Sequence, residues 1–255
     1  MSLPVLLVLD WGVGGFGVVR LLREQAPGLS LAYFSDGGFA PYGKLPPLVL
    51  AARLERVLSH FWAQGVRHAV VACNAASTVV PSLRLPPGLT VTEIIGPGVE
   101  LVRQTGFAEI GLVGGVRTVR SGAHRARLRP FGVRVRSRVA QPLSALIEAG
   151  DLDSSHLHTE LRRIVAPLAG LPALLLACTH YPAIAPVFEA ALPGVRLLDP
   201  AEQAARVVLS AIPVDSGGRL SVFTSGDPEA TRRGAFLAFG VETGPATALR
   251  DDRLC

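Results

Sequence analysis

Two cysteines, Cys73 and Cys178, each follow a run of apolar residues and lie 105 residues apart. The stretches around them, residues 70–74 and 175–179, are alike, and other short motifs recur at nearly the same offset. Because a repeat of several elements in one order indicates a duplicated unit, we expect two similar halves packed about a pseudo-twofold axis. Such packing puts the two thiols opposite each other across a cleft, where they can act on two sides of one carbon atom.

Two further polar side chains accompany the cysteines. Asp10 follows the first apolar run, and His180 comes two residues after Cys178. Ligands of open α/β sheets bind beyond the carboxyl ends of the strands, which is where all these residues are expected. Backbone N–H groups at a helix start can lower the pKa of a thiol from its usual value of about 8.5. A neighbouring imidazole can exchange the thiol proton or orient the side chain. The pattern predicts acid–base chemistry on paired cysteines.

Two alternative roles for the cysteines, as buried core residues or as metal ligands, are less well supported by the sequence. A single free cysteine is more often a small buried hydrophobic residue, but two at equivalent strand ends favour chemistry. A metal site is disfavoured because neither cysteine has a C-x-x-C partner and His180 is the only close imidazole. We therefore expect no metal.

A glycine-rich segment supports a rival interpretation. Residues 12–17 satisfy the G-x-G-x-x-G pattern between an expected strand and an expected helix, and Asp36 follows the next strand. These are the contextual tests for a dinucleotide site. Against it, the carboxylate of Asp10 at the strand tip would repel a pyrophosphate. The glycines can also serve tight turning and close packing without any phosphate.

Apolar stretches alternate with amphipathic ones along the chain, which is typical of an α/β fold with parallel sheets. Strands are expected near residues 4–9, 29–34, 67–72, 90–95, 109–113, 133–139, 173–177, 195–198 and 220–224. Helices are expected near residues 15–25, 47–64, 97–105, 121–130, 142–149, 155–168, 183–191 and 200–211. Continuously apolar strands indicate sheets covered on both faces. We expect two lobes, residues 1–96 with 212–255 and residues 97–211, with breaks at 96–98 and 213–218.

Composition excludes several classes of protein. The 255 residues are 49% hydrophobic and 18% charged, yet the apolar runs are far shorter than the roughly 20 residues that cross a bilayer. The start of the chain lacks the basic region of a signal peptide, so a cytoplasmic location is expected. Three cysteines, an odd number, argue against a disulfide framework. Cys255 is expected to be an exposed bystander.

The net charge of +5 comes from arginines, since Lys44 is the only lysine. Eight arginines crowd residues 117–138. A nucleic-acid surface is one interpretation of this stretch, and solvated arginines on a helix and an adjoining strand are the ordinary one. Among them Phe131 is the only aromatic residue, which weakens the case for base stacking. We therefore expect no nucleic-acid partner.

Six short motifs occur along the chain in one order. They are Asp10-x-Gly12-Val13-Gly14-Gly15, Pro41-Tyr42-Gly43, Cys73-Asn74-x-Ala76-Ser77, Arg120-Ser121-Gly122-Ala123, Cys178-Thr179-His180-Tyr181-Pro182 and Thr224-Ser225-Gly226-Asp227-Pro228. Together they resemble the glutamate racemases of the cofactor-independent aspartate/glutamate racemase superfamily. The resemblance covers nearly the whole chain, and the combination of both cysteine motifs with the first and last motifs is specific.

This resemblance implies two like-folded lobes around the active site, no cofactor, and a homodimer as the usual assembly. It implies that Cys73 and Cys178 form a two-base pair that interconverts L- and D-glutamate in the cytoplasm, supplying D-glutamate for peptidoglycan synthesis. Asp10 would assist Cys73, and His180 with Glu148 would assist Cys178. The implied substrate contacts are Asp10, Trp11, Pro41, Tyr42, Gly43, Asn74, Ala75, Thr118, Thr179 and His180.

Several positions depart from the family pattern. Trp11 stands where the family has serine, and Ala75 and Gly115 stand where threonine is usual. Residues 37–39 replace a Thr-Ala-Arg-like stretch, and Gly96 replaces a frequent glutamate. Each lost hydrogen bond to a charged group costs roughly 1.5–3 kcal/mol of binding. Two alternatives therefore stay open: a cysteine-pair racemase or isomerase with another substrate, or a member that has lost catalysis and serves in binding or regulation.

Overall fold

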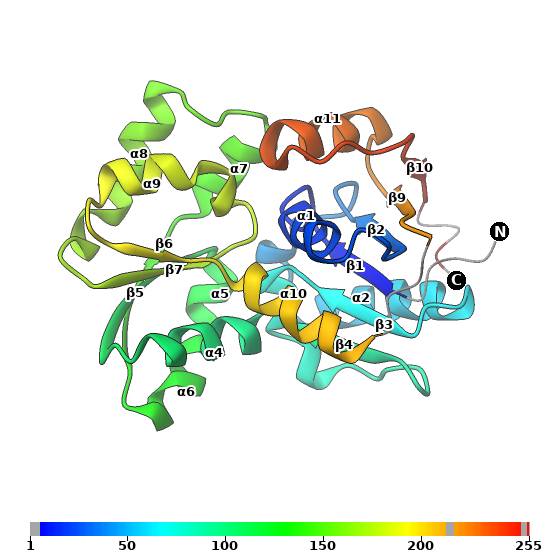
Figure 1. The fold of residues 1–255 in the computed structure, drawn as a ribbon, viewed down its shortest axis with the longest axis horizontal. Helices are drawn as coiled ribbons and strands as arrows, with labels where there is room; N and C mark the ends of the chain where they lie inside the picture. The colour runs from blue at the N-terminus through cyan, green and yellow to red at the C-terminus, as the bar shows by residue number, and fades with distance from the viewer. Residues whose placement is uncertain (1–5, 213–216, 251–253, 255) are drawn as a thin grey trace.

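The computed structural model describes residues 6–212, 217–250 and 254, and it contains two β-sheets covered by helices on both faces (Figure 1). Every strand pairing within these residues is parallel. The expected α/β fold with two lobes of parallel sheet is therefore confirmed. The start of the expected strand at 4–9, most of the expected break at 213–218, and Cys255 lie outside the described residues.

The first sheet has the strand order β10-β9-β2-β1-β3-β4. In chain order its strands are β1 (Leu6–Asp10), β2 (Leu31–Ser35), β3 (His68–Val71), β4 (Thr90–Glu93), β9 (Leu220–Thr224) and β10 (Thr247–Ala248). One face is covered by α1 (Phe16–Gln25), α10 (Pro200–Ala211) and α11 (Pro228–Phe239), and the other by α2 (Pro47–Ala63) and α3 (Asn74–Ser77).

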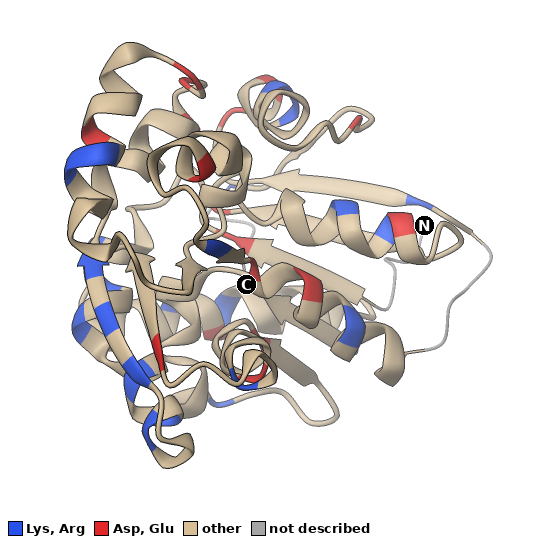
Figure 2. Cartoon of the chain, turned by 60° about the vertical axis from the view of Figure 1, so that its left-hand side comes forward, with Lys and Arg blue, Asp and Glu red and all other residues tan. Residues whose placement is uncertain are grey.

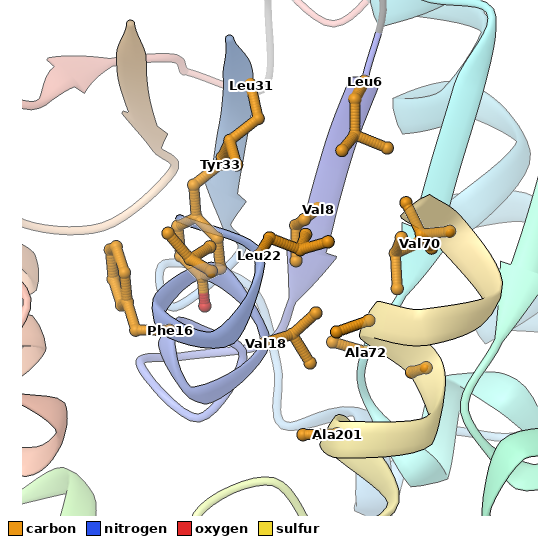
Figure 3. Close-up of a cluster of buried hydrophobic side chains, with 14 of the residues drawn as sticks. Leu6, Val8, Phe16, Val18, Leu22, Leu31, Tyr33, Val70, Ala72 and Ala201 are labelled. Carbon is orange, nitrogen blue, oxygen red and sulfur yellow. The ribbon is translucent and has the colours of Figure 1, made fainter. Parts of the chain in front are cut away.

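Strand β1 shows why these strands are apolar throughout. Leu6 and Val8 belong to the same buried cluster as Ala201 of α10 (Figure 3), whereas Leu7 and Leu9 belong to the cluster under α2. Alternate side chains of a strand point to opposite faces of the sheet, so both faces need apolar residues. Full burial of each such side chain contributes roughly 1.5–3 kcal/mol, which fixes the strand tip that carries Asp10.

The second sheet has the strand order β6-β5-β7-β8. Its strands are β5 (Glu109–Gly114), β6 (Arg134–Val139), β7 (Ala173–Ala177) and β8 (Arg196–Leu198). One face is covered by α7 (Gln141–Glu148), α8 (Ser155–Val165) and α9 (Ala185–Ala191), and the other by α4 (Ile95–Thr105) and α6 (Ala123–Leu128).

The two sheets repeat one topology. The order β2-β1-β3-β4 in the first corresponds strand for strand to β6-β5-β7-β8 in the second. Cys73 lies two residues after the end of β3, and Cys178 directly follows β7, the equivalent strand. The duplication seen in the sequence is therefore a duplication of the folded unit, and the two cysteines occupy matching positions in it.

Some elements differ from the sequence-based expectation. Helix α11, strand β10 and two short helices, α3 and α5 (Val116–Ser121), were not expected. The expected helix at 121–130 is shorter, because α6 gives way to a 3₁₀ turn at Arg129–Phe131. The expected crossing at 96–98 lies inside the first turn of α4, where a proline is tolerated because its missing N–H would have no helical partner.

Helix α10 packs against both α1 and α4, so it touches elements of each lobe, and the lobe boundaries at 97 and 212 stay a prediction. Within the described ranges, no helix combines the length and apolarity needed to cross a membrane.

The arginine-rich stretch runs over α5, α6 and β6 on one side of the second lobe (Figure 2). Arg136 donates to the carbonyl oxygen of Pro167 at 2.7 Å, and Arg138 donates to that of Ile164 at 3.3 Å. These carbonyls lie at and just beyond the end of α8, where helical partners run out. Part of the stretch therefore has a structural role on the second lobe.

Candidate active site

A cavity at the carboxyl ends of β1, β3 and β7 contains both cysteines. It encloses about 510 Å³ of empty space, part of it open to solvent. Its lining includes every residue expected to contact substrate, namely Asp10, Trp11, Pro41, Tyr42, Gly43, Asn74, Ala75, Thr118, Thr179 and His180. The duplicated strand ends thus bring Cys73 and Cys178 to one cavity.

Asp10 lies beside Cys73 and is fully buried. Its carboxylate accepts a hydrogen bond from the backbone N–H of Trp11 at 2.7 Å and from the hydroxyl of Thr179 at 2.6 Å. The second bond joins the two lobes across the cavity. Burial raises the pKa of Asp10 above its ordinary value of 3.8, although the charge of His180 and these hydrogen bonds oppose the rise.

Cys73 precedes α3 and is partly buried. Burial of the thiol, followed by the negative charge of Asp10, raises the pKa of Cys73 well above its ordinary value of 9.0. Both causes disfavour the charged form. In the unliganded site at neutral pH, Cys73 is therefore a protonated thiol, suited to deliver a proton.

Cys178 has a different set of partners. His180 Nδ1 lies 3.7 Å from Cys178 Sγ, and His180 Nε2 lies 2.6 Å from Glu148 Oε2. Burial lowers the pKa of His180, but hydrogen bonds and charge interactions with Cys178 and Glu148 outweigh it, so the pKa lies well above 6.5. Glu148 itself does not line the cavity but supports His180 from behind. This chain of three groups can move a proton to or from the second thiol.

The glycine-rich segment serves packing between the lobes. A Cβ atom at Gly12 would lie 2.5 Å from the carboxylate of Glu148, and one at Gly14 would overlap the hydroxyl of Thr179. The backbone N–H of Val13 also donates to Glu148 Oε2 at 3.2 Å. The space in which a phosphate would lie on these glycines is filled by side chains of the second lobe. The dinucleotide interpretation is therefore wrong.

Asp36 is the carboxylate that would bind a ribose in the dinucleotide interpretation, but in the structure it has other partners. Arg53 binds it through two hydrogen bonds of 2.8 and 2.6 Å, and the hydroxyls of Tyr42 and Ser225 donate to it at 2.6 and 2.7 Å. Both charged side chains are almost fully buried. Asp36 thus holds the Tyr42 segment at the edge of the cavity instead of a ribose.

Asn74 follows Cys73 and is 2% exposed, yet neither polar atom of its side chain has a hydrogen-bond partner among the described residues. Buried polar groups are nearly always paired, because an unpaired one costs about 1–3 kcal/mol. Since Asn74 lines the cavity, the missing partner points to a polar ligand. Across the described part of the chain, no group of three His, Cys, Asp or Glu side chains has the arrangement of a metal site.

Comparison with known proteins agrees with this geometry. Residues 46–208 match the Asp/Glu/hydantoin racemase family. A glutamate racemase of Thermus thermophilus is 36% identical over 235 residues, which cover 88% of each chain. Another, of Desulforudis audaxviator, is 33% identical over 95% of this chain and 96% of that one. The chain belongs to the Asp/Glu/hydantoin racemase family. It is a racemase and hence an isomerase.

Solved racemase structures share the whole fold. The T. thermophilus glutamate racemase in complex with β-chloro-D-alanine aligns with a TM-score of 0.85 at 31% identity, over 99% of this chain and 98% of that one. An aspartate racemase of Picrophilus torridus aligns with a TM-score of 0.66 at 16% identity, over 81% of this chain and 93% of that one, and so shares the fold alone.

Two departures of this racemase from the family pattern are coupled. The indole N–H of Trp11 donates to the backbone oxygen of Phe39 at 3.0 Å. The ring of Phe39 in turn lies 4.3 Å from the guanidinium carbon of Arg53. Glycine is needed at position 38, next to Phe39, because a Cβ atom there would overlap the backbone of Ser225. The bulky indole at the cavity edge is thus held by residues 37–39, the other segment in which this chain departs from the family pattern.

Two polar residues of the cavity were not expected from the sequence. Gln141 and Ser144 lie in the first turn of α7 and line the cavity opposite the first lobe. The apolar pattern predicted the helix but gave no reason to assign its first turn to the site. Only the packing of the two lobes brings that turn to the cavity.

Proposed function

We propose that this racemase inverts an acidic amino acid without a cofactor, using Cys73 and Cys178 as the two acid–base groups, and that glutamate is the first substrate to test. The observation that supports this most is that both thiols meet at one cavity, each with its own proton partner. The relatives named as glutamate racemases support the choice of substrate.

The chemistry needs two groups on opposite faces. The α-proton beside an ionised carboxylate is weakly acidic, so its removal needs a well-placed, desolvated base. One sulfur takes this proton, and the other thiol returns a proton to the opposite face of the same carbon. A single base would tend to return the proton to the face it left, so efficient inversion needs two.

The two cysteines have different partners for proton transfer. Cys73 is protonated at rest, so in the direction in which Cys178 takes the substrate proton, Cys73 can donate its own proton directly. In the reverse direction Cys73 must lose its proton first. The raised pKa of Asp10 makes this carboxylate a suitable acceptor for it. His180, supported by Glu148, plays the corresponding part for Cys178.

Polar groups around the thiols would hold the substrate. The unpaired amide of Asn74 can bind both a carboxylate and an ammonium group, because it offers donors and an acceptor. The hydroxyl of Thr179 donates its hydrogen to Asp10, so towards the substrate it offers lone pairs. Donors aimed at the substrate carboxylate would stabilise the charge that develops as the proton leaves.

Single-face proton exchange tests this assignment. Because enantiomers are equally stable, kcat/KM must be equal in both directions, and rates of racemisation cannot separate the two cysteines. In deuterium oxide, Cys73→Ser should abolish racemisation but leave α-proton exchange on the enantiomer whose proton faces Cys178. Cys178→Ser should leave exchange only on the other enantiomer.

The wild-type protein and a panel of L- and D-glutamate, aspartate, glutamine and asparagine complete the experiment. Absence of exchange with every member would contradict the proposal and favour a member of the family that has lost catalysis. Exchange on both enantiomers in either cysteine variant would contradict the two-base assignment.

A second candidate is a racemase for a different substrate. It is favoured by the indole of Trp11 and by the missing hydroxyls at Ala75 and Gly115, all of which line the cavity. The same panel decides between the two, because preference for an amino acid other than glutamate would support this alternative.

We also propose, from the family resemblance, that the protein is a cytoplasmic homodimer that supplies D-glutamate for peptidoglycan. Sedimentation velocity tests the assembly, and rescue of a strain that requires D-glutamate tests the cellular role. A monomer, or a failure to rescue by an active enzyme, would contradict the respective part.

A further inference from the structure

Gln141 is anchored at the cavity by three hydrogen bonds, one from the start of α5 and two within the first turn of α7. Its Oε1 accepts from the backbone N–H of Val116 at 3.2 Å, and its Nε2 donates to Ser144 Oγ at 3.0 Å. Ser144 Oγ donates in turn to the backbone oxygen of Gln141 at 2.9 Å. Because a backbone N–H can only donate, the first bond fixes which end of the amide is oxygen.

The position of this amide is tied to a departure from the family pattern. A Cβ atom at Gly115, where the family usually has threonine, would lie 2.8 Å from Gln141 Oε1. A Cβ atom at Gly43, on the opposite lobe, would lie 3.2 Å from the same oxygen. The amide therefore occupies space that a side chain at position 115 would need. Compared with the family pattern, a polar side chain is missing at position 115, directly after β5, and the polar side chain of Gln141 from α7 lies in that space.

One hydrogen of this amide is left over. An amide nitrogen carries two donors, and Gln141 Nε2 uses one for Ser144. Within the described residues it has no second acceptor, and the side chain lines the cavity together with both cysteines. Among the residues that the structure describes, no arginine or lysine lines that cavity, so a substrate oxygen there depends on neutral donors of this kind.

We infer that Gln141 is a specificity-determining residue of this racemase, whose Nε2–H donates to a carboxylate or carbonyl oxygen of the amino-acid substrate. The inference rests on the proposed function, since it assigns a contact within the same site. On this inference, the hydrogen-bond donor that the family has at position 115 is not simply lost. Glycine at position 115 leaves space for the side chain of Gln141, which provides a hydrogen bond to the substrate instead.

A purely structural role for Gln141 makes a different prediction. Its oxygen caps the start of α5, so removal of the side chain lowers stability in either case. A cap alone would change the melting temperature and leave substrate affinity untouched. The test therefore follows KM, kcat and the Kd for L-glutamate together with the melting temperature.

Gln141→Met keeps length and removes both polar atoms. The expected result is an increase of KM, and of the Kd measured by calorimetry, by about tenfold to a hundredfold, the range of one hydrogen bond to a charged group. The change in kcat should be about threefold or less, because proton transfer itself is left to the cysteines. Gln104→Met, on the exposed side of α4, is the matched control and should leave KM unchanged.

Gln141→Glu gives a readout that depends on pH. The carboxylate can still accept from Val116, but when ionised it repels a substrate carboxylate. Its KM for glutamate should exceed that of Gln141→Met at neutral pH and fall as the pH approaches about 4.3, where a free glutamate side chain gains a proton and can donate again.

Gly115→Thr tests the exchange. Alone it should weaken binding, because its Cβ atom collides with the amide of Gln141. In the double variant Gly115→Thr/Gln141→Ala it should restore much of the affinity lost in Gln141→Ala. The effect of Gly115→Thr on affinity would then be unfavourable in the wild type and favourable in Gln141→Ala, which measures the coupling between the two neighbouring positions directly.

Failure of this inference can be told apart from failure of the proposed function. If the wild type binds L-glutamate but exchanges no α-proton, only the proposed function is contradicted. If exchange occurs and Gln141→Met lowers the melting temperature with KM and Kd within about twofold of wild type, only the inference is overturned. Absence of binding by every amino acid of the panel contradicts both.

Discussion

At the scale of single residues, the two thiols are chemically unequal although the fold places them equivalently. Leu9 pairs with Val71 in the first sheet as Val113 pairs with Leu176 in the second. Asp10 therefore has Gly114 at the matching position of the second lobe, and Ala75 matches His180. Cys73 therefore has a buried carboxylate as its neighbour, whereas Cys178 has an imidazole supported by Glu148. Each half of the duplicated unit has kept a different proton partner.

Alkylation of Cys73 tests the effect of its neighbour. Because burial and the charge of Asp10 raise its pKa well above 9.0, its reaction with iodoacetamide, followed by peptide mass spectrometry, should still accelerate above that pH. In Asp10→Asn the charge is gone, so the acceleration should shift to lower pH while racemisation becomes slower. A midpoint for Cys73 near 9.0 that does not respond to Asp10→Asn would contradict this account.

At the scale of elements, the site depends on the contact between the 12–17 segment and α7. Glu148 stands at the last residue of α7, and its carboxylate lies against the backbone of Gly12 and Val13. This contact lets a side chain of the second lobe support His180 while touching the first lobe. The absence of a side chain at Gly12 and Gly14 is thus a condition for the proton path to Cys178.

Gly12→Ala should disturb this contact without unfolding the chain. The new methyl group lies 2.5 Å from the end of the Glu148 side chain, which can move away but then loses His180. We expect kcat to fall by about tenfold or more, since one hydrogen bond to a charged group is lost, with a small change in melting temperature. Gly244→Ala is the matched control, because nothing lies near its Cβ position. Equal kcat in the two variants would refute the expectation.

At the scale of the whole molecule, stability should respond to acid through His124. This residue is 2% exposed, and its ring nitrogens have no hydrogen-bond partner in the part of the chain that the structure describes. Burial, together with the charge of Arg127, lowers its pKa to about 4. The unfolded chain takes up the proton near 6.5, so it binds more protons than the folded chain between these values. Folding stability should therefore be lost as the pH falls from about 6.5 to about 4, by about 3 kcal/mol at most.

Denaturant unfolding of wild type and His124→Leu at several pH values measures this contribution. Asp199, whose burial raises its pKa to about 6, titrates in the same range with the opposite sign. The difference in unfolding free energy between the two proteins removes that effect. His124→Gln serves as a second variant, and a difference that stays constant with pH would show that His124 is not the group responsible.

Much of the fold was predictable because it is encoded locally. Continuous apolar runs such as Leu6–Asp10 and Ala173–Ala177 predicted buried parallel strands. The elements that were missed are short or weakly patterned. Helix α5 has only six residues, and β10 has two residues that depend on pairing with β9.

The sequence by itself determined the duplicated parallel-sheet unit, the two cysteines at equivalent strand ends, and the set of residues that line the cavity from the motifs. The first two follow from short-range patterns of apolar and polar residues, and the third follows from the resemblance of the motifs to the racemase family. Only the tertiary structure decided between a phosphate and a side chain on the glycine-rich segment, and only it brought Gln141 and Ser144 into the site. The physical reason is that these contacts join residues far apart in the sequence across two lobes, such as Gly12 with Glu148 and Gly43 with Gln141. No local sequence pattern indicates which distant side chain will fill a given space.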